Sequence, residues 1–365
     1  MRSTPGLTPL IGLVNVGVMI VAAVVLLVMP LDDHGPDPRR AAATPGPPAS
    51  PSQALPTPST AAPVTATAEL ARRVGANELG LVPVLMYHRI QKKRRASIDR
   101  TPAQLRAELV TLAESGYVPV TAAEFAAGRM DVPAGSHPVV LTFDDGSPTH
   151  FALGADGWPA PDTAVRIILD VARDHPGFRP VATFWVNKEP FGITGHDRQA
   201  AAVRWLVDHG FEVANHTYDH PDLRRLRKKK VAEQIVRQSR LLHAAGAPRS
   251  ATFALPYGSM PRKRATARSG KWDGTSYRFD AVFLAGAEPA ISPYAKGFDR
   301  FAIPRVQSNG KKGECRKWCS QYWLEWLDRH PDRRYTSDGD PARVSMPREI
   351  RGKIATKSRE MAIAY

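Results

Sequence analysis

The stretch "VVLTFDDGSP", residues 139–148, decides how the rest of the sequence is interpreted. Its first five residues are aliphatic or aromatic apart from Thr142, which carries the only hydroxyl among them. A short apolar run of this kind, ended by turn residues, predicts a buried strand. Buried strands belong to parallel sheets that helices cover, and ligands bind at the carboxyl ends of such strands. We therefore expect Asp144 and Asp145 to lie where a ligand can reach them.

Two adjacent carboxylates repel each other unless a cation or a shared proton relieves them. The plain alternative is a turn, because Asp-Asp-Gly is common in turns. A second apolar run, "FEVANHTYDHPDL", places His216 and His220 at the end of another predicted strand. Two histidines and one aspartate are a common ligand set for a divalent metal that keeps open positions. One aspartate can then bind the metal while the other takes a proton from the attacking water, as in a metal hydrolase.

Apolar runs alternate with helical patterns through the middle of the chain. Strands are predicted at 82–88, 138–143, 181–187, 211–216, 251–258 and 281–286, and helices at 102–116, 162–175, 228–245 and directly before residue 211. Thr101 and Pro102 are typical of a helix start, and Gly116 of a helix end. This alternation predicts an α/β fold with a parallel sheet, open or closed into a barrel.

Three short motifs carry a family resemblance. "TFDDG", "HTYDH" and "PYG", in this order, resemble the polysaccharide deacetylases that share the NodB-homology domain of the carbohydrate esterase family 4 type. The resemblance covers roughly residues 80 to 310 and implies a distorted (β/α) barrel. It also implies that Asp144 is the catalytic base and that Asp145, His216 and His220 are the metal ligands. Zinc is the expected metal, with cobalt, nickel or iron as alternatives.

The "PYG" motif, residues 256–258, implies further roles by the same resemblance. Tyr257 stands where the family uses a backbone N–H to hold the oxyanion, which needs a donor aimed at the tetrahedral intermediate. Pro256 and Gly258 are expected to line the substrate site. The chain departs from the family at Ala254, where many members carry an arginine.

The general acid is expected from a different part of the chain than in many members, because the usual late Leu-x-His motif is missing. "VLMYHRI" places His88 after an early strand, which resembles the poly-β-1,6-N-acetylglucosamine deacetylases, where an early histidine is the acid. We expect His88 to protonate the leaving amine; the alternative is that Tyr87 and His88 only end the strand. Arg305 in "FAIPRV" is a candidate to orient a catalytic carboxylate or to contact the substrate.

The expected activity is metal-dependent removal of acetyl groups from an N-acetylglucosamine polymer of the cell envelope or extracellular matrix. Two alternatives stay open at this point. One is an O-acetyl esterase that acts on a xylan-like glycan with the same side chains. The other is a catalytically silent domain that binds glycan.

The N-terminal region differs from the rest in composition. Leu10–Met29 contains no charge and one clearly polar side chain, Asn15. This segment is long enough to span a membrane. The expected organisation is a membrane anchor at 1–30, a Pro/Ala/Thr-rich linker at 31–75, the deacetylase domain at 76–330 and a polar extension at 331–365. The flanking charges predict a single-pass membrane protein with its catalytic domain outside the cell. A secreted protein with a cleaved signal is the alternative.

The formal net charge of +15 comes from clusters of basic residues. Such a surface attracts acidic envelope polymers or lipid head groups, whereas no nucleic-acid-binding module is recognisable, so nucleic acid is not expected as a partner. Cys315 and Cys319 are the only cysteines. Outside the cell they favour a disulfide, with free thiols or half of a zinc site as alternatives.

Overall fold

The computed structural model describes residues 64–365. The predicted anchor at Leu10–Met29 and nearly all of the predicted linker lie outside the described residues. Within residues 64–365, no helix has both the length and the apolar character needed to cross a bilayer.

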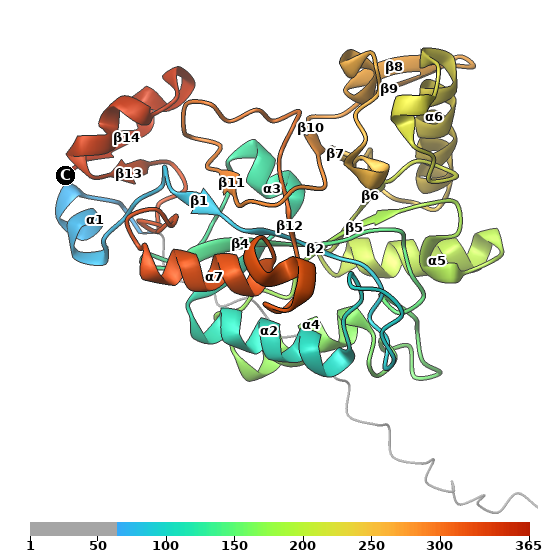
Figure 1. Ribbon diagram of the computed structural model, residues 1–365, viewed down its shortest axis with the longest axis horizontal. Coiled ribbons are helices and arrows are strands. Elements are labelled where there is room, and N and C mark those ends of the chain that lie inside the picture. Colours follow the sequence, from blue (N-terminus) through green and yellow to red (C-terminus); the bar gives the residue numbers. More distant parts are fainter. Residues whose placement is uncertain (1–63) are drawn as a thin grey trace, which may run out of the picture. The chain divides into compact units, whose positions relative to one another are not determined.

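An eight-stranded parallel sheet forms the centre of the described part (Figure 1). The strand order is β10-β7-β6-β5-β4-β2-β12, and β3 also pairs with β4. The strands are β2 (Val84–Tyr87), β3 (Tyr117–Val120), β4 (His137–Phe143), β5 (Thr183–Val186), β6 (Glu212–Asn215), β7 (Thr252–Ala254), β10 (Ala281–Phe283) and β12 (Val306–Gln307). Three two-stranded pairs accompany it: β1 (Leu81–Val82) with β11 (Ala290–Ile291), β8 (Ser269–Trp272) with β9 (Thr275–Arg278), and β13 (Val344–Met346) with β14 (Ala362–Ala364).

The sheet is strongly curled. Ile303 pairs with Phe283 of β10, and three residues later Val306 pairs with Leu85 of β2. The short stretch 303–307 therefore contacts both edges of the sheet. The prediction of an α/β fold with parallel strands is confirmed.

Helices pack on both faces of the sheet. The helices are α1 (Ala68–Val74), α2 (Pro102–Glu114), α3 (Ala122–Ala127), α4 (Ala164–Asp174), α5 (His196–Asp208), α6 (Lys228–Ala244) and α7 (Ser320–Arg329). Side chains alternate between the two faces of each strand, as strand geometry requires. Leu141, Phe143 and Phe184 belong to the core that α2, α4 and α5 share. Val140 and Trp185 face the other way, into the core inside the curl.

Most predicted elements are present, with changed ends. Thr101 caps α2 in a reciprocal capping box with Gln104, and Pro102 is the first helical residue. The strand predicted at 82–88 is divided into β1 and β2 at Pro83, whose backbone has no N–H to donate to a ladder. The sequence patterns predicted neither β3 nor α3. The strand β3 has only four residues and contains Pro119, which is unusual in a strand inside a sheet.

Two segments near the ends of the described residues form secondary structure that the sequence did not predict. Residues 68–74, assigned to the linker, form α1, which Thr67 caps and Gly75 ends with a φ of 64°. The segment 331–365, expected to be a polar extension, forms β13 and β14 and contributes Val344 and Met346 to the inner core. Its few apolar residues are spaced for this packing, which composition alone does not reveal.

Candidate metal and catalytic site

Three side chains converge at the carboxyl ends of β4 and β6. The ligand atoms of Asp145, His216 and His220 all lie within 4.8 Å of one another. Asp145 Oδ1 is 3.5 Å from His216 Nε2 and 3.2 Å from His220 Nε2. Two ligands that are each ~2.0–2.1 Å from a tetrahedral zinc ion are about 3.3 Å apart. The donor atoms and their separations therefore fit a small divalent metal, and three protein ligands would leave a position open.

The orientation of His216 also suits a metal ligand. Its Nδ1–H donates to the carbonyl of Ala254, 2.8 Å away, which leaves Nε2 facing Asp145. Metal-binding histidines usually have such a partner on the second ring nitrogen, because it fixes the tautomer and the ring. Asn187 holds the following backbone by donating to the carbonyls of His216 and Thr217.

Backbone strain is concentrated at this site. The described residues include eight non-glycine residues with a positive φ, and four of them are here: Asp145, Thr217, His220 and Tyr257. Such conformations are unfavourable for L-residues and persist where the surrounding structure enforces them. The left-handed turn after β4 points the side chains of Asp144 and Asp145 in different directions, so these two adjacent aspartates have different partners.

Asp144 is buried, and its partner is Arg305. The guanidinium of Arg305 donates two hydrogen bonds of 2.7 Å, one to each carboxylate oxygen of Asp144. Arg305 also donates to the carbonyl of Leu284 and to the hydroxyl of Thr142, and its guanidinium lies 5.0 Å from the ring centre of Trp185. Arg305 is 0% exposed, so it reaches a substrate only through Asp144. The geometry fits the orienting role and not the direct substrate contact that was the other expectation for it.

The charges at the site set the direction of each pKa. Burial raises the pKa of Asp144, but the positive charge of Arg305 outweighs burial and the net pKa is lowered. Burial alone would also raise the pKa of Asp145, and its bond to His216 brings the net pKa below its usual value. Burial lowers the pKa of His220. Burial acts in the same direction on His216, but the charge of Asp144 and the bond to Asp145 outweigh it, and the net pKa of His216 is raised. Both carboxylates are therefore ionised at neutral pH.

His88 lies at the end of β2, next to this cluster. It is half-buried, and burial lowers its pKa while the nearby charges of Asp144 and Asp145 act in the opposite direction. Its Nδ1 is buried and has no hydrogen-bond partner within residues 64–365. The carbonyl of His88 contacts His150 Nε2 at 2.6 Å. The early histidine of the sequence analysis is thus brought to the two aspartates.

Tyr257 and Gly258 form the rim of the site in the turn η3 (Pro256–Gly258). Tyr257 is 69% exposed and its ring centre lies 4.6 Å from that of His220. Gly258 has a φ of 65°, and a Cβ there would lie 2.8 Å from the backbone nitrogen of Ala285. Only glycine fits this position, because the loop after β10 packs directly against it.

Sequence reasoning missed several residues that support the site. Thr142 links β4 to Arg305, and its conspicuous hydroxyl in an apolar strand could have indicated this. No feature of the sequence indicated the contacts that the carbonyl of Ala254 and the indole of Trp185 make. Every residue has a backbone carbonyl, and many buried strands contain an aromatic residue. Arg305 directly precedes β12 and supplies a positive charge to Asp144 despite the departure at Ala254.

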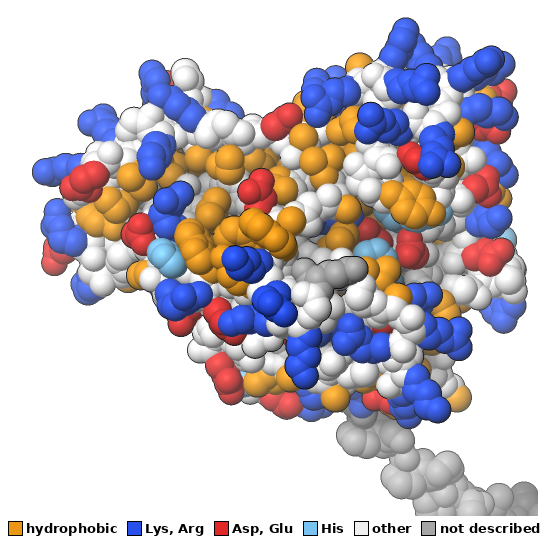
Figure 2. All heavy atoms as spheres, viewed as in Figure 1, with side chains coloured by type: hydrophobic (Ala, Val, Ile, Leu, Met, Phe, Trp, Pro, Cys, Tyr) orange, Lys and Arg blue, Asp and Glu red, His pale blue; other side chains and the backbone are white. Residues whose placement is uncertain are grey.

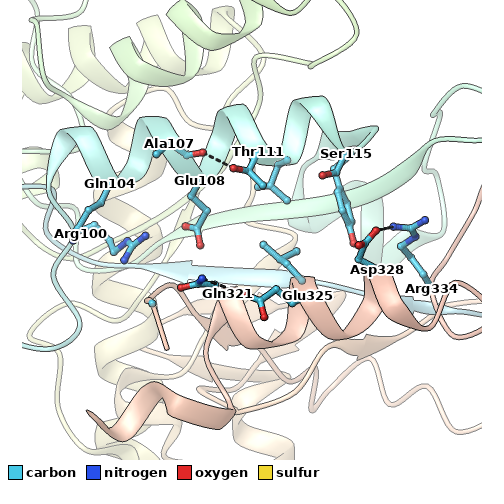
Figure 3. A pocket seen from close by; sticks show the side chains of 14 residues that line it. Arg100, Gln104, Ala107, Glu108, Thr111, Ser115, Gln321, Glu325, Asp328 and Arg334 are labelled. Carbon is cyan, nitrogen blue, oxygen red and sulfur yellow. Dashed lines mark hydrogen bonds and ion pairs between the residues drawn. The ribbon is translucent and has the colours of Figure 1, made fainter. Parts of the chain in front are cut away.

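A second cavity, of about 480 Å³, lies apart from these side chains. It lies between α2 and α7 and is open to solvent, and Glu108, Gln321 and Arg334 are among its lining residues (Figure 3). None of the predicted site residues lines it. The convergent aspartates and histidines, and not this cavity, form the candidate active site.

The curled parallel sheet and these side chains define the class: an α/β protein with a candidate metal site of two histidines and one aspartate beside a buried carboxylate. Residues 131–270 match the family model described as polysaccharide deacetylase. The matched residues include Asp144, Asp145 and both site histidines, whereas His88 and Arg305 lie outside them.

Known proteins are similar over part of the chain. It is 37% identical over 112 residues to the chitooligosaccharide deacetylase of a Bradyrhizobium species and 35% identical over 111 residues to that of Sinorhizobium fredii. These matches take 31% and 30% of this chain and 42% of each relative, so the chain spans about two fifths of the length of the curated relatives it matches. The structure of IcaB from Ammonifex degensii is 22% identical, with a TM-score of 0.45, over 64% of this chain and 93% of IcaB.

Proposed function

We propose that the protein is a metal-dependent deacetylase of an N-acetylated polysaccharide, with a polymer of N-acetylglucosamine as substrate. One observation carries this proposal: a buried, ionised aspartate lies directly beside a two-histidine, one-aspartate ligand set, within the residues that match the deacetylase family. The proposed similarity to the poly-β-1,6-N-acetylglucosamine deacetylases rests on the early position of His88 in the sequence.

Asp145, His216 and His220 would hold the metal. When bound, a divalent metal supplies Lewis acidity, which polarises the acetyl carbonyl and makes water acidic enough for a carboxylate to deprotonate. Zinc suits the nitrogen and oxygen donors, and cobalt, nickel or iron are alternatives for the same set.

The residues of the chain move the protons. Asp144 accepts a proton from the water that attacks the acetyl carbon, and Arg305 keeps Asp144 ionised and in one orientation for this step. The backbone N–H of Tyr257 stabilises the oxyanion that forms. The bond between carbon and nitrogen then breaks, and His88 gives a proton to the leaving amine. The products are acetate and a free amino sugar.

The turn at Tyr257 and Gly258 forms the substrate side of the site. Gly258 lets the loop after β10 pack against the turn, and Pro256 and Gly258 line the substrate site on either side of Tyr257. The exposed ring of Tyr257 lies beside His220 and forms a wall for the sugar. We place this site outside the cell, on a membrane anchor formed by Leu10–Met29 or on a secreted protein. The disulfide between Cys315 and Cys319 is in keeping with an oxidising compartment.

Acetate release tests the proposal. The full chain is incubated with β-1,6- and β-1,4-linked N-acetylglucosamine oligomers and with acetylated xylan, each with zinc or with a chelator. We expect release from an N-acetylglucosamine series that the chelator abolishes and zinc restores. Release from acetylated xylan alone would indicate an O-acetyl esterase. Metal binding without release from any substrate would favour the silent glycan-binding domain.

A further inference from the structure

A group of aromatic side chains lies on α7 and the loop that precedes it, with Trp318 exposed and Tyr322 and Trp323 half-buried. We call Trp318, Tyr322 and Trp323 the aromatic strip. The ring centre of Trp318 is 6.5 Å from that of Tyr322 and 6.3 Å from that of Trp323, and Tyr322 and Trp323 are 5.3 Å apart. Trp318 is 55% exposed, and with Tyr257 it is one of two aromatic residues among the exposed large hydrophobic side chains of residues 64–365. Figure 2 shows hydrophobic side chains gathered over α7 on this face.

The backbone at the exposed residue Trp318 is strained. Its φ of 135° is unfavourable for a residue with a side chain. The disulfide between Cys315 and Cys319 closes the loop around it. A strained backbone that presents a large apolar ring to water is uncommon without a binding role, and exposed apolar patches of this kind mark interaction sites.

A short piece of chain connects the aromatic strip to the candidate active site. The indole N–H of Trp323 donates to the carbonyl of Ala287, 2.6 Å away. Two residues earlier, Ala285 packs against Gly258 of the rim turn, where a Cβ would lie 2.8 Å from its nitrogen. Two residues of extended chain span about 7 Å. The aromatic strip therefore lies within a short polymer's reach of Tyr257.

We propose that the aromatic strip is a second glycan-binding subsite, which holds an acetylated part of the same polymer while another sugar lies at the metal site. This inference rests on the proposed function. A sugar ring has an apolar face of C–H groups and a polar edge, and exposed Trp and Tyr rings match both properties. Exposed Tyr257 at one end and Trp318 at the other would contact rings along one chain.

The charges around the aromatic strip favour acetylated sugars over the product. Lys311, Lys312, Arg316 and Lys317 lie in the loop and are exposed, and of these four Lys311 forms an ion pair with Glu325. Deacetylation gives each sugar an ammonium group, which these cations repel. An acetylated sugar carries no charge and avoids this repulsion, so the subsite retains the part of the polymer that has not yet reacted.

Substrate length provides the test, because a dimer at the metal site does not reach the aromatic strip and a hexamer does. The full chain and its variants are assayed on the N-acetylglucosamine dimer and hexamer of the linkage that releases acetate. We expect Trp318→Ala to raise KM for the hexamer about tenfold, with kcat unchanged and the dimer kinetics unaffected. Trp318→Phe, which keeps an aromatic ring, restores most of the hexamer KM.

Two controls separate stacking from general effects. Trp272→Ala removes a half-buried tryptophan from the β8–β9 hairpin, where its ring contacts Arg240 instead of the aromatic strip, and should leave both substrates unaffected. An unchanged hexamer KM in the double variant Trp318→Ala, Trp323→Ala would overturn the proposal. So would an equal loss on dimer and hexamer.

Two further outcomes are distinct. Quenching of wild-type tryptophan fluorescence by vesicles of brominated phosphatidylglycerol, lost in Trp318→Phe while hexamer kinetics stay the same, would assign the aromatic strip to a membrane surface and overturn the proposal. If the wild type releases no acetate, the proposed function fails instead. Calorimetry with the hexamer then still decides the subsite: binding that is lost in Trp318→Ala supports it, and binding that is unchanged overturns it.

Discussion

Asp144 and Glu78 are equally buried, each 3% exposed, yet the protein treats their charges in opposite ways. Arg305 holds the pKa of Asp144 below its usual value, whereas burial and the charge of Asp338 raise the pKa of Glu78 well above its own. Tyr335 Oη and the backbone N–H of Ser345 donate to Glu78, and no ion pair within residues 64–365 involves it.

The difference shows that the partner, and not burial, decides whether a buried carboxylate is ionised. A bidentate arginine compensates the desolvation of Asp144 and prepares it to accept a proton. Glu78 has only neutral donors and joins the residues before β1 to the C-terminal segment as an uncharged group. Asp144 therefore acts in the proposed reaction, whereas Glu78 stabilises the fold, and variants at the two positions should have different effects.

The largest expected contrast is in turnover. Asp144→Asn removes the base and should lower kcat about a thousandfold, a loss typical of general bases. Glu78→Gln keeps the neutral hydrogen bonds and should leave kcat within about twofold of the wild type. Acetate release at saturating substrate measures both. Full activity in Asp144→Asn would show that another group is the base.

Stability should respond next most strongly to the loss of Arg305. Arg305→Met leaves Asp144 buried without its cation, and removing one partner of a buried pair typically costs about 3–5 kcal/mol. Urea unfolding measures this loss. The double variant Asp144→Asn, Arg305→Met should recover part of it, since the amide carries no charge, and a double variant no more stable than Arg305→Met would argue against the pairing.

Metal affinity tests the histidines. His216→Ala removes one of three ligands, and we expect zinc affinity to fall by more than about a hundredfold, since even outer partners of metal ligands contribute about 10- to 100-fold. Isothermal titration calorimetry gives the affinity. His243→Ala, on the exposed side of α6, is the matched control and should bind zinc like the wild type.

The smallest effect is a dependence of stability on pH. Because the pKa of Glu78 is raised in the folded state, the folded protein keeps a proton that the unfolded chain loses above about pH 4.5. Glu78 therefore makes the wild type less stable as the pH rises beyond that point. Glu78→Gln should reduce this decline between pH 4.5 and 7.5 in urea unfolding. An unchanged decline would mean that Glu78 is ionised in the fold.

The sequence predicted the strands that carry the site, because β4 and β6 are unbroken apolar runs and end in chemically unusual residues. It predicted the convergence of Asp145, His216 and His220 because parallel strands end at one edge of a sheet. Arg305 was expected to orient a catalytic carboxylate, and it pairs with Asp144, 161 residues away; only the bidentate geometry of the pair has no local signature in the sequence.

The chain ends show where sequence reasoning fails. The segment 331–365 is mostly polar, yet Val344 and Met346 are fully buried, because β13 and β14 pair only in the tertiary context. Glu78 and Asp338 are likewise ordinary acidic residues in the sequence, 260 positions apart, and their shared burial appears only when the two ends of the domain meet.

The most direct test of the account is a zinc titration of two neighbouring variants, Asp144→Asn and Asp145→Ala. We propose that these adjacent carboxylates have separate roles, one as base and one as metal ligand. Asp144→Asn should then bind zinc with the affinity of the wild type and release no acetate, whereas Asp145→Ala should bind zinc much more weakly. Equal zinc affinity in both variants, or a loss confined to Asp144→Asn, would contradict this division of roles.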